Sequence, residues 1–316
     1  MRVAVLDDYQ NYAVEKADWG SLAGDLEFVS FTDHLFDDDE IAERLRDFEI
    51  VCAMRERTRF QRTLFEKLPK LKLVITSGMR NASIDNEAAT DHGVTVCGTQ
   101  SVGAPTADLA FGLMLALARQ IVREDRNVRK GGWQQTIGVG LSGRTLGVLG
   151  LGKLGGQAAK IGQAFGMNVI AWSQNLTDER CKEVGATLVN KEDLLRQSDF
   201  ITIHLVLSDR THGLLGASDL ALMKPTAYLV NTSRGPIVDE DALASVLMNK
   251  GIAGAGLDVF SVEPLPADHV FRTLENTVIT PHLGYVEQDN YQSYFEGYRA
   301  AIRGFLDDAP VNVLNG

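Results

Sequence analysis

Short apolar runs alternate with helical patterns along nearly the whole chain, and this alternation restricts the fold more than any other feature. Strands that alternate with helices form parallel sheets with helices on both faces. The predicted strands are Val3–Leu6, Glu27–Phe31, Ile50–Met54, Leu71–Thr76, Val94–Val96, Leu146–Leu149, Asn168–Trp172, Ala186–Val189, Phe200–Leu205, Ala227–Asn231, Gly254–Val259 and Thr277–Thr280. We therefore expect an α/β protein built from doubly wound parallel sheets.

A glycine-rich turn joins one of these strands to a helix. The stretch TLGVLGLGKLGGQAAKIG begins with the predicted strand Leu146–Leu149 and continues through Gly150, Gly152 and Gly155. The helix predicted after this turn is amphipathic, and its apolar face is formed by Leu154, Ala158, Ile161 and Phe165. In such a turn one glycine bends the chain, one lets the backbone approach phosphates and one lets helix and strand pack. The backbone N–H groups near Lys153 and Leu154 then form an anion site. The turn predicts a bound dinucleotide.

The chain is long enough for two domains, and a helical segment from about Pro105 to Lys130 separates two α/β regions. A last helix is predicted at Gln288–Leu306, and we expect it to rejoin the first region. This organisation predicts a discontinuous first domain (1–100 and 285–316) and an inserted Rossmann-like nucleotide-binding domain (101–284). Both would be Rossmann-like or flavodoxin-like, and ligands commonly bind in a cleft between two such domains.

Charge and cysteine content exclude several classes of function. The net charge is −11, from 31 basic and 42 acidic residues, so nucleic acid is not expected as a partner. An anionic substrate would have to be bound by a few local arginines. Cys52, Cys97 and Cys181 are odd in number and lack a CxxC spacing, which indicates reduced, buried thiols, with no disulfide framework and no metal site.

No targeting segment is predicted. The N-terminal MRVAVLDDYQ passes directly into a strand, unlike a signal peptide. The most apolar stretch, Ala104–Ala118, contains Asp108 and is short for a membrane span. We expect a soluble cytoplasmic protein without a membrane partner.

Three polar residues follow predicted strands of the second region. Arg234 lies in NTSRGP, Glu263 in LDVFSVEPLP and His282 in TPHLG. Because the carboxyl ends of parallel strands meet at one edge of the sheet, these residues are expected to converge. With Gly150–Gly155, the motifs Asn231–Gly235, Leu257–Pro264 and Pro281–Gly284 occur in order, and the chain from about Ile50 onward resembles the D-isomer-specific 2-hydroxyacid dehydrogenases.

This resemblance implies a nicotinamide-dependent oxidoreductase that interconverts a 2-keto acid and a D-2-hydroxyacid. Such a reaction needs a hydride at carbon and a proton at the developing alkoxide. His282 is the candidate acid/base, because imidazole titrates in the required range. Glu263 would orient the ring and favour imidazolium. Arg234 would hold the substrate carboxylate and polarise its carbonyl.

The resemblance also implies further cofactor contacts and an assembly. It places Asp258 near the nicotinamide amide, and it places other residues along the cofactor, namely His204, Thr232, Ser233 and Gly284. It further implies a homodimer built around the inserted domain and the helix that begins near Pro105.

The chain departs from the usual pattern at the end of the second Rossmann strand. An NAD-preferring site ends this strand with an acid that binds the ribose hydroxyls. Here the position falls on Ser173, followed by Gln174 and Asn175, while Arg180 and Lys182 come soon after. A 2′-phosphate would not be rejected, so both NAD and NADP stay open as the cofactor.

The loop expected to bind the substrate carboxylate is also unusual. It reads Thr76–Ser83, in which Ser77, Gly78 and Met79 are expected to offer backbone N–H groups, and Arg80 adds a cation. Arg55, after the strand Ile50–Met54, is a further candidate. If Arg80 or Arg55 faces the substrate, that substrate carries a second anionic group.

Two alternative functions stay open from the sequence. A formate dehydrogenase of the same superfamily carries an amide where this chain has Glu263, which argues against it. A nucleotide-sensing regulatory protein, like the corepressors that share this fold, would keep the three polar residues and is not excluded by the motifs.

Overall fold

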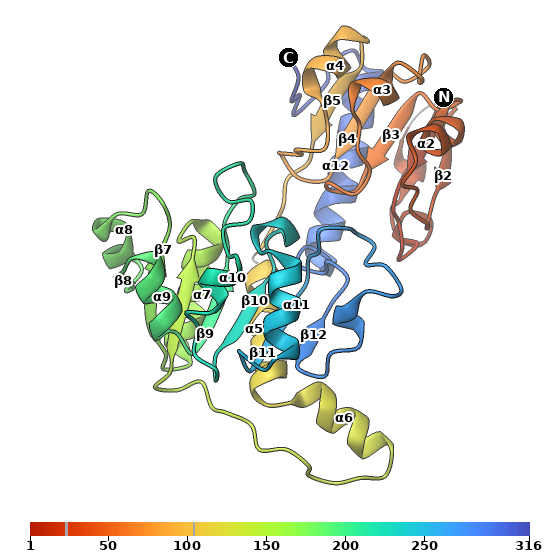
Figure 1. Cartoon of the computed structure of the whole chain (residues 1–316). Coiled ribbons are helices and arrows are strands. Elements are labelled where there is room, and N and C mark those ends of the chain that lie inside the picture. Colours follow the sequence, from red (N-terminus) through yellow and green to blue (C-terminus); the bar gives the residue numbers. More distant parts are fainter. Residues whose placement is uncertain (23–24, 104) are drawn as a thin grey trace. The chain divides into compact units, whose positions relative to one another are not determined.

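The structure, a computed structural model, describes residues 1–22, 25–103 and 105–316. The chain divides into two compact units (Figure 1). Unit 1 comprises Met1–Gly103 and Glu287–Gly316, and unit 2 comprises Ala104–Val286. These borders lie close to the expected ones at 100/101 and 284/285. Ala104, which begins the apolar stretch noted above, is outside the described residues.

Unit 1 is built on a parallel five-stranded sheet with the order β2-β1-β3-β4-β5. This order is that of flavodoxin-like folds. Its strands β3 and β4 are buried along their whole length, as expected for strands covered on both faces. The strands are β1 (Arg2–Val5), β2 (Glu27–Ser30), β3 (Ile50–Ala53), β4 (Leu73–Thr76) and β5 (Thr95–Gly98).

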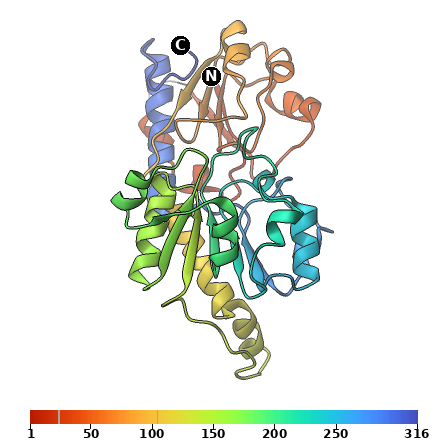
Figure 2. The same ribbon diagram turned by 60° about the vertical axis from the view of Figure 1, so that its left-hand side comes forward.

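The last helix of the chain belongs to unit 1, as its sequence position had suggested. Helix α12 (Gln288–Leu306) contacts β4 and β5 (Figure 2). The buried Tyr298 hydroxyl donates a hydrogen bond of 3.0 Å to the carbonyl of Ala53 at the end of β3. The other helices of this unit are α1 (Tyr12–Glu15), α2 (Asp38–Leu45), α3 (Arg62–Phe65) and α4 (Asn86–Asp91), with the 3-10 turn η1 (Trp19–Ser21).

Unit 2 contains a parallel seven-stranded sheet with the order β12-β11-β10-β9-β6-β7-β8. The first strand lies in the middle, and the chain builds outward on one side and then on the other, which is the Rossmann arrangement. The direction of building changes between β6 and β9. The strands are β6 (Thr145–Leu149), β7 (Asn168–Trp172), β8 (Thr187–Leu188), β9 (Phe200–Ile203), β10 (Tyr228–Asn231), β11 (Gly254–Leu257) and β12 (Thr277–Ile279).

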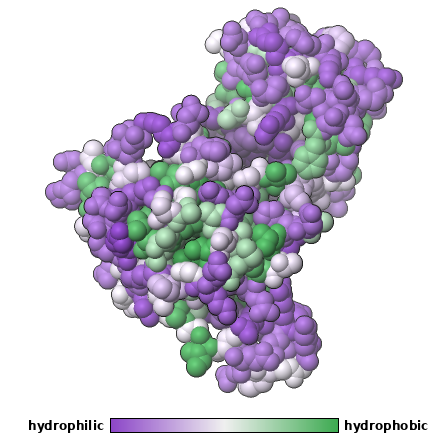
Figure 3. Space-filling view, viewed as in Figure 1, coloured by the Kyte–Doolittle hydropathy of each residue, from purple (hydrophilic) through white to green (hydrophobic). Residues whose placement is uncertain are grey.

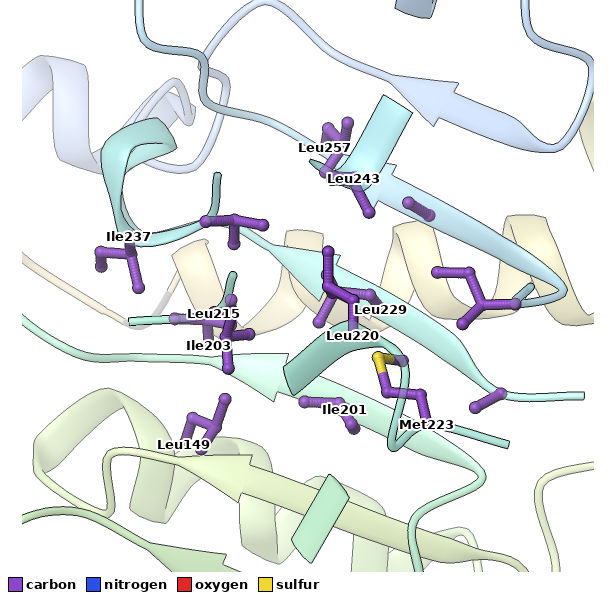
Figure 4. Close-up of a cluster of buried hydrophobic side chains, with 14 of the residues drawn as sticks. Leu149, Ile201, Ile203, Leu215, Leu220, Met223, Leu229, Ile237, Leu243 and Leu257 are labelled. Atoms are coloured by element: carbon purple, nitrogen blue, oxygen red, sulfur yellow. The ribbon is translucent and has the colours of Figure 1, made fainter. Parts of the chain in front are cut away.

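Helices cover both faces of this sheet. Helices α5 and α7 pack on one face of the sheet. The core between them and the sheet includes Phe111 of α5 and Leu146 of β6. On the opposite face, α9 contributes Leu194 to a second core. Helices α10 and α11 contribute Leu220 and Leu243 to the same core (Figure 4). The helical elements are α5 (Pro105–Ala118), α6 (Ile121–Arg129), α7 (Lys153–Ala164), α8 (Asp178–Glu183), α9 (Lys191–Gln197), α10 (Ala217–Leu220), α11 (Glu240–Met248), η2 (Gly235–Ile237) and η3 (Val270–Arg272).

The segment expected to be helical, from about Pro105 to Lys130, is helical but is broken near its middle. The structure has two helices, α5 and α6, which meet at 62°. Gln120 at the junction has a φ of 54°, in the left-handed region that ends a right-handed helix. Within the described residues no single helix is long and apolar enough to cross a membrane, although α5 and α6 together pass that test by length and composition.

The buried stripe of α7 also differs from the expected one. Its buried residues are small, and they include Gly155, Ala158 and Gly162. A Cβ added to Gly162 would lie 2.6 Å from the Leu146 side chain in β6. Phe165 caps the helix and is 40% exposed. The helix approaches the sheet closely through small side chains, so a pattern of large apolar residues does not mark its inner face.

The three cysteines are buried, as expected, and free of disulfide bonds. Burial raises the pKa of Cys52 and Cys181, and it raises that of Cys97 to about 11. A buried thiol with a raised pKa is a poor nucleophile. These cysteines therefore act as small apolar residues.

Candidate active site

The carboxyl ends of the unit 2 strands bring polar residues together. Parallel pairing sets Ile203 beside Asn231, and Asn231 beside Leu257. The next residues along the three strands are His204, Thr232 and Asp258, so all three occupy one edge of the sheet. Ligands bind at this edge in open α/β sheets. The edge is therefore the place to look for a site.

The glycine turn has the geometry that a phosphate-binding turn needs. Gly150 has a φ of 96°, which side chains with a Cβ rarely adopt. A Cβ on Gly155 would lie 1.8 Å from the carbonyl oxygen of Gly150, so helix α7 can pack here only with glycine. Gly152 differs, because a Cβ there would meet nothing within 4 Å. Two glycines build the turn, and the third leaves space for a ligand.

The first turn of α7 faces that space. Gly152 is its N-cap and has no side chain to accept from the helix N–H groups. The first N–H groups of a helix have no carbonyl partner within it, and the helix dipole adds positive potential. Lys153 is exposed beside them. The pyrophosphate of a dinucleotide fits this set of donors.

Two buried polar atoms at the same edge have no hydrogen-bond partner among the described residues. They are Nδ1 of His204 and Oγ1 of Thr232. His204 Nε2 lies 3.0 Å from the Thr202 hydroxyl, and burial lowers its pKa to about 4. Buried polar atoms normally have partners, so a polar ligand at this edge would satisfy both. The residues present fit the dinucleotide that the glycine turn predicts.

The low pKa of His204 has a consequence for stability. Unfolding restores the ordinary pKa of 6.5, so between pH 6.5 and about 4 only the unfolded chain binds this proton. The stability present above pH 6.5 is lost as the pH falls, by about 2 kcal/mol at pH 5. Urea unfolding of the cofactor-free protein at pH 7.5 and pH 5 should show a smaller difference for His204→Asn than for the parent. Equal differences would contradict this expectation.

His282 and Glu263 form an ion-pair geometry in unit 2. Nδ1 of His282 lies 2.6 Å from Oε2 of Glu263, and both side chains are mostly buried. Oε1 of Glu263 accepts from the Phe260 N–H at 2.9 Å. An ionised carboxylate only accepts, so Nδ1 carries the hydrogen and Nε2 is left to exchange a proton with a ligand.

The segment with Arg234 packs against the loop with Glu263. The Arg234 carbonyl accepts from the Asn231 side chain at 3.0 Å, and Nη1 donates to the Ser233 carbonyl at 2.7 Å. A Cβ on the next residue, Gly235, would lie 2.1 Å from the carbonyl carbon of Phe260. This contact joins the segments that carry Arg234 and Glu263. The Ser233 hydroxyl, expected along the cofactor, donates to the Leu205 carbonyl.

Asp258 holds the turn that carries His282. Its Oδ1 accepts from the Thr280 hydroxyl at 2.6 Å and from the Leu283 N–H at 2.7 Å, and its Oδ2 accepts from the Gly284 N–H at 2.8 Å. Burial raises the pKa of Asp258, while these hydrogen bonds and the nearby His282 act in the opposite direction. His282 itself has a φ of 54°. Asp258 is thus a positioning residue for His282, and its contact with the nicotinamide amide stays a prediction.

The sequence motifs gave little indication of the residues that hold the turn with His282 in place. Besides Thr280, Thr106 at the start of α5 fixes the same turn, because its hydroxyl donates to the Gly284 carbonyl at 2.7 Å. The only sequence signal was position: Thr280 ends the predicted strand and Thr106 follows Pro105.

In unit 1 the loop after β4 differs from expectation. The N–H of Ser77 donates to the Ala53 carbonyl at 3.1 Å, and that of Gly78 donates to the Thr99 hydroxyl at 3.0 Å. The expectation that these two N–H groups would bind a carboxylate is therefore wrong, because tertiary contacts of the sheet use them. Met79, Arg80 and Ala82 are exposed in this loop, and Arg80 is its exposed cation.

Arg55 lies against this loop. Its Nη1 donates to the Ser77 carbonyl at 2.9 Å, and its Nη2 lies 3.5 Å from the carboxylate of Glu56. A Cβ on Gly78 would lie 1.9 Å from Nη1. The glycine therefore makes room for the guanidinium on the face of the loop.

The chain is similar to several known proteins. Residues 111–284 match the family model described as D-isomer specific 2-hydroxyacid dehydrogenase, NAD binding domain. A glyoxylate reductase of Thermococcus litoralis is 38% identical over 87% of this chain and 86% of its own. A D-3-phosphoglycerate dehydrogenase of Methanocaldococcus jannaschii is 36% identical over 88% of this chain and 54% of its own. The solved structure of a phosphoglycerate oxidoreductase of Vibrio cholerae matches this chain with a TM-score of 0.93 at 35% identity. The match covers 98% of this chain and 100% of that one.

Proposed function

Because the chain belongs to the family of D-isomer-specific 2-hydroxyacid dehydrogenases and is an NAD(P)-dependent oxidoreductase, we propose that it interconverts a small 2-keto acid and the D-2-hydroxyacid with His282 as acid/base. The observation that carries this proposal is the 2.6 Å contact between His282 and Glu263. The contact leaves Nε2 of the ring for the reacting oxygen. Gly150, Gly152 and Gly155 would hold the cofactor, with Lys153 and Leu154 at the start of α7.

Each polar residue then has one role. The bound nicotinamide supplies the hydride in reduction and accepts it in oxidation. His282 gives its Nε2 proton to the oxygen of the keto group as negative charge develops there, and in the reverse direction takes it back. Glu263 holds the ring and stabilises its charged form. Arg234 presents a planar cation suited to a carboxylate, which would fix the keto group beside His282.

The experiment that tests the proposal is turnover with a panel of keto acids. Purified protein is mixed with NADH or NADPH and with glyoxylate, hydroxypyruvate, pyruvate, 3-phosphohydroxypyruvate or oxaloacetate, and cofactor absorbance is followed. We expect turnover of at least one 2-keto acid. Cofactor binding without turnover of any would favour a nucleotide-sensing protein instead.

Unit 1 is proposed as the substrate domain, with Arg80 and Arg55 as candidate contacts to a second anionic group. Replacing Arg80 with alanine is expected to raise KM for phosphorylated or dicarboxylic keto acids about tenfold, the effect of losing one charge-assisted hydrogen bond. KM for glyoxylate should stay within about twofold, because glyoxylate has no second anion. Arg59→Ala removes the same charge from another exposed position of unit 1 and is the control. An unchanged KM for the dianionic acids would end this idea.

A homodimer is proposed through α6 and the segment that follows it. This segment carries Trp133, which is 74% exposed, and Ile137, which is 99% exposed. Figure 3 shows a small hydrophobic patch on this otherwise largely hydrophilic end of unit 2. Oε1 of Glu124 accepts from the N–H groups of Gln135 and Thr136, which gives the segment a defined path. Exposed apolar patches commonly mark interfaces.

Light scattering should give twice the chain mass, and the double variant Trp133→Ser, Ile137→Ser should give a monomer. A monomeric parent would contradict the proposal.

A further inference from the structure

Arg180 reaches back from α8 to the glycine turn. Its Nε lies 3.2 Å from the carbonyl oxygen of Leu151, and its Nη2 lies 3.4 Å from that of Gly152. Nη2 is also 3.1 Å from where a Cβ of Gly156 would be, so the guanidinium lies over the first turn of α7. The sequence placed this arginine only near the end of β7.

The guanidinium keeps hydrogen-bonding capacity in this position. Nη1 donates to Glu183 at 2.8 Å, and a guanidinium has five N–H groups. The three contacts described leave one N–H on each of Nη1 and Nη2 for a ligand. The side chain is 39% exposed, so a ligand can reach it.

The position directly after β7 lacks the carboxylate that would repel a 2′-phosphate. Strand β7 pairs with β6 so that Trp172 lies beside Leu149, and the Gly150 N–H donates to the Trp172 carbonyl at 2.8 Å. The residue after β7 therefore lies beside the glycine turn, where the adenosine ribose of a dinucleotide binds. That residue is Ser173. Its hydroxyl does not exclude a 2′-phosphate, whereas an acid would.

We propose that Arg180 binds the 2′-phosphate of NADP and makes the enzyme prefer NADP(H) over NAD(H). The proposal rests on the proposed cofactor site at Gly150–Gly155. Arg180 is fixed beside Gly152 by the turn's own carbonyls, so its fork is oriented before the cofactor arrives. A phosphate dianion and a planar guanidinium form charge-assisted, bidentate hydrogen bonds. Glu183 keeps the arginine partly neutralised when the site is empty.

Helix α8 supplies a matched control. Lys182 carries the same charge two residues away, but it pairs with Asp178 and its side chain is 73% exposed. Nothing described connects it to the glycine turn. Lys182→Ala therefore changes the net charge as Arg180→Ala does, without touching the proposed phosphate contact.

The test is direct binding, measured by calorimetry without substrate. The titrants are NADPH, NADH, adenosine 2′,5′-bisphosphate and AMP. The parent should bind NADPH and the bisphosphate more tightly than NADH and AMP. Arg180→Ala should weaken both 2′-phosphorylated ligands about tenfold or more, as expected for a lost charge-assisted contact. NADH and AMP should change by less than about threefold, and Lys182→Ala should leave the ratio of NADPH to NADH affinity unchanged.

Two further variants change the preference in opposite directions. Glu183→Gln should tighten NADPH, because it removes a competing carboxylate, and Ser173→Asp should move the preference toward NADH. Equal loss of NADPH and NADH affinity in Arg180→Ala would overturn the proposal, because it would show that the arginine only braces the turn. A parent that binds NADH as tightly as NADPH would also overturn it. Failure of the parent to bind either cofactor would instead refute the cofactor site itself.

Discussion

Replacing His282 with asparagine is expected to lower kcat about a hundredfold to ten-thousandfold, the usual contribution of a positioned acid/base. Asparagine tolerates the left-handed backbone that His282 adopts, with a φ of 54°. The turn held by Asp258 should therefore keep its shape. The Kd for cofactor should change by less than about threefold, because only proton transfer is removed. Steady-state kinetics and calorimetric titration measure the two quantities.

The control for this variant is His92→Asn. His92 is exposed in unit 1, and its ring lies 2.8 Å from the Ala88 carbonyl. It should retain full activity. A second comparison adds Glu263→Gln: alone it should lower kcat, but in the His282→Asn background it should add little, since the carboxylate acts through the imidazole. A loss of less than about tenfold in His282→Asn would show that another group supplies the proton.

Alanine at Gly155 and alanine at Gly152 should both weaken cofactor binding, but only the substitution at Gly155 should also destabilise the fold. At Gly155 the new Cβ would lie 1.8 Å from the Gly150 carbonyl oxygen, so α7 and β6 must separate. Overpacking of this kind costs about 1–3 kcal/mol or more, and cofactor binding should be lost with it. At Gly152 the Cβ meets nothing within 4 Å, and the weaker N-cap costs at most about 1 kcal/mol. It would, however, occupy the space left for the pyrophosphate.

Thermal unfolding and cofactor titration separate the two cases. Gly152→Ala should unfold close to the parent temperature, yet bind NADH and NADPH at least tenfold more weakly. Gly155→Ala should unfold well below the parent. Gly112, in α5, has no atom within 4 Å of its added Cβ, so Gly112→Ala is a neutral control. Unchanged cofactor affinity in Gly152→Ala would place the dinucleotide elsewhere.

The predicted strands and the observed ones agree to within a few residues, because buried parallel strands are short apolar runs that local sequence displays. The break between α5 and α6 was not predicted. Residues Arg119–Gln120 carry no proline or glycine, and Gln120 adopts its left-handed backbone where α5 ends. The occupied N–H groups of Ser77 and Gly78 were missed for a similar reason, since their acceptors, Ala53 and Thr99, lie on other segments of the chain.

By itself, the sequence determined the alternation of strands and helices, the glycine turn, and the residue types that follow each strand. These features are local, and parallel pairing carries them to a common edge. Only the tertiary structure decided which partner each polar atom has: Glu263 for His282, the turn at Thr280–Gly284 for Asp258, and the glycine turn for Arg180. Hydrogen bonds act over about 3 Å, and residues far apart along the chain reach that distance only when the whole sheet has formed.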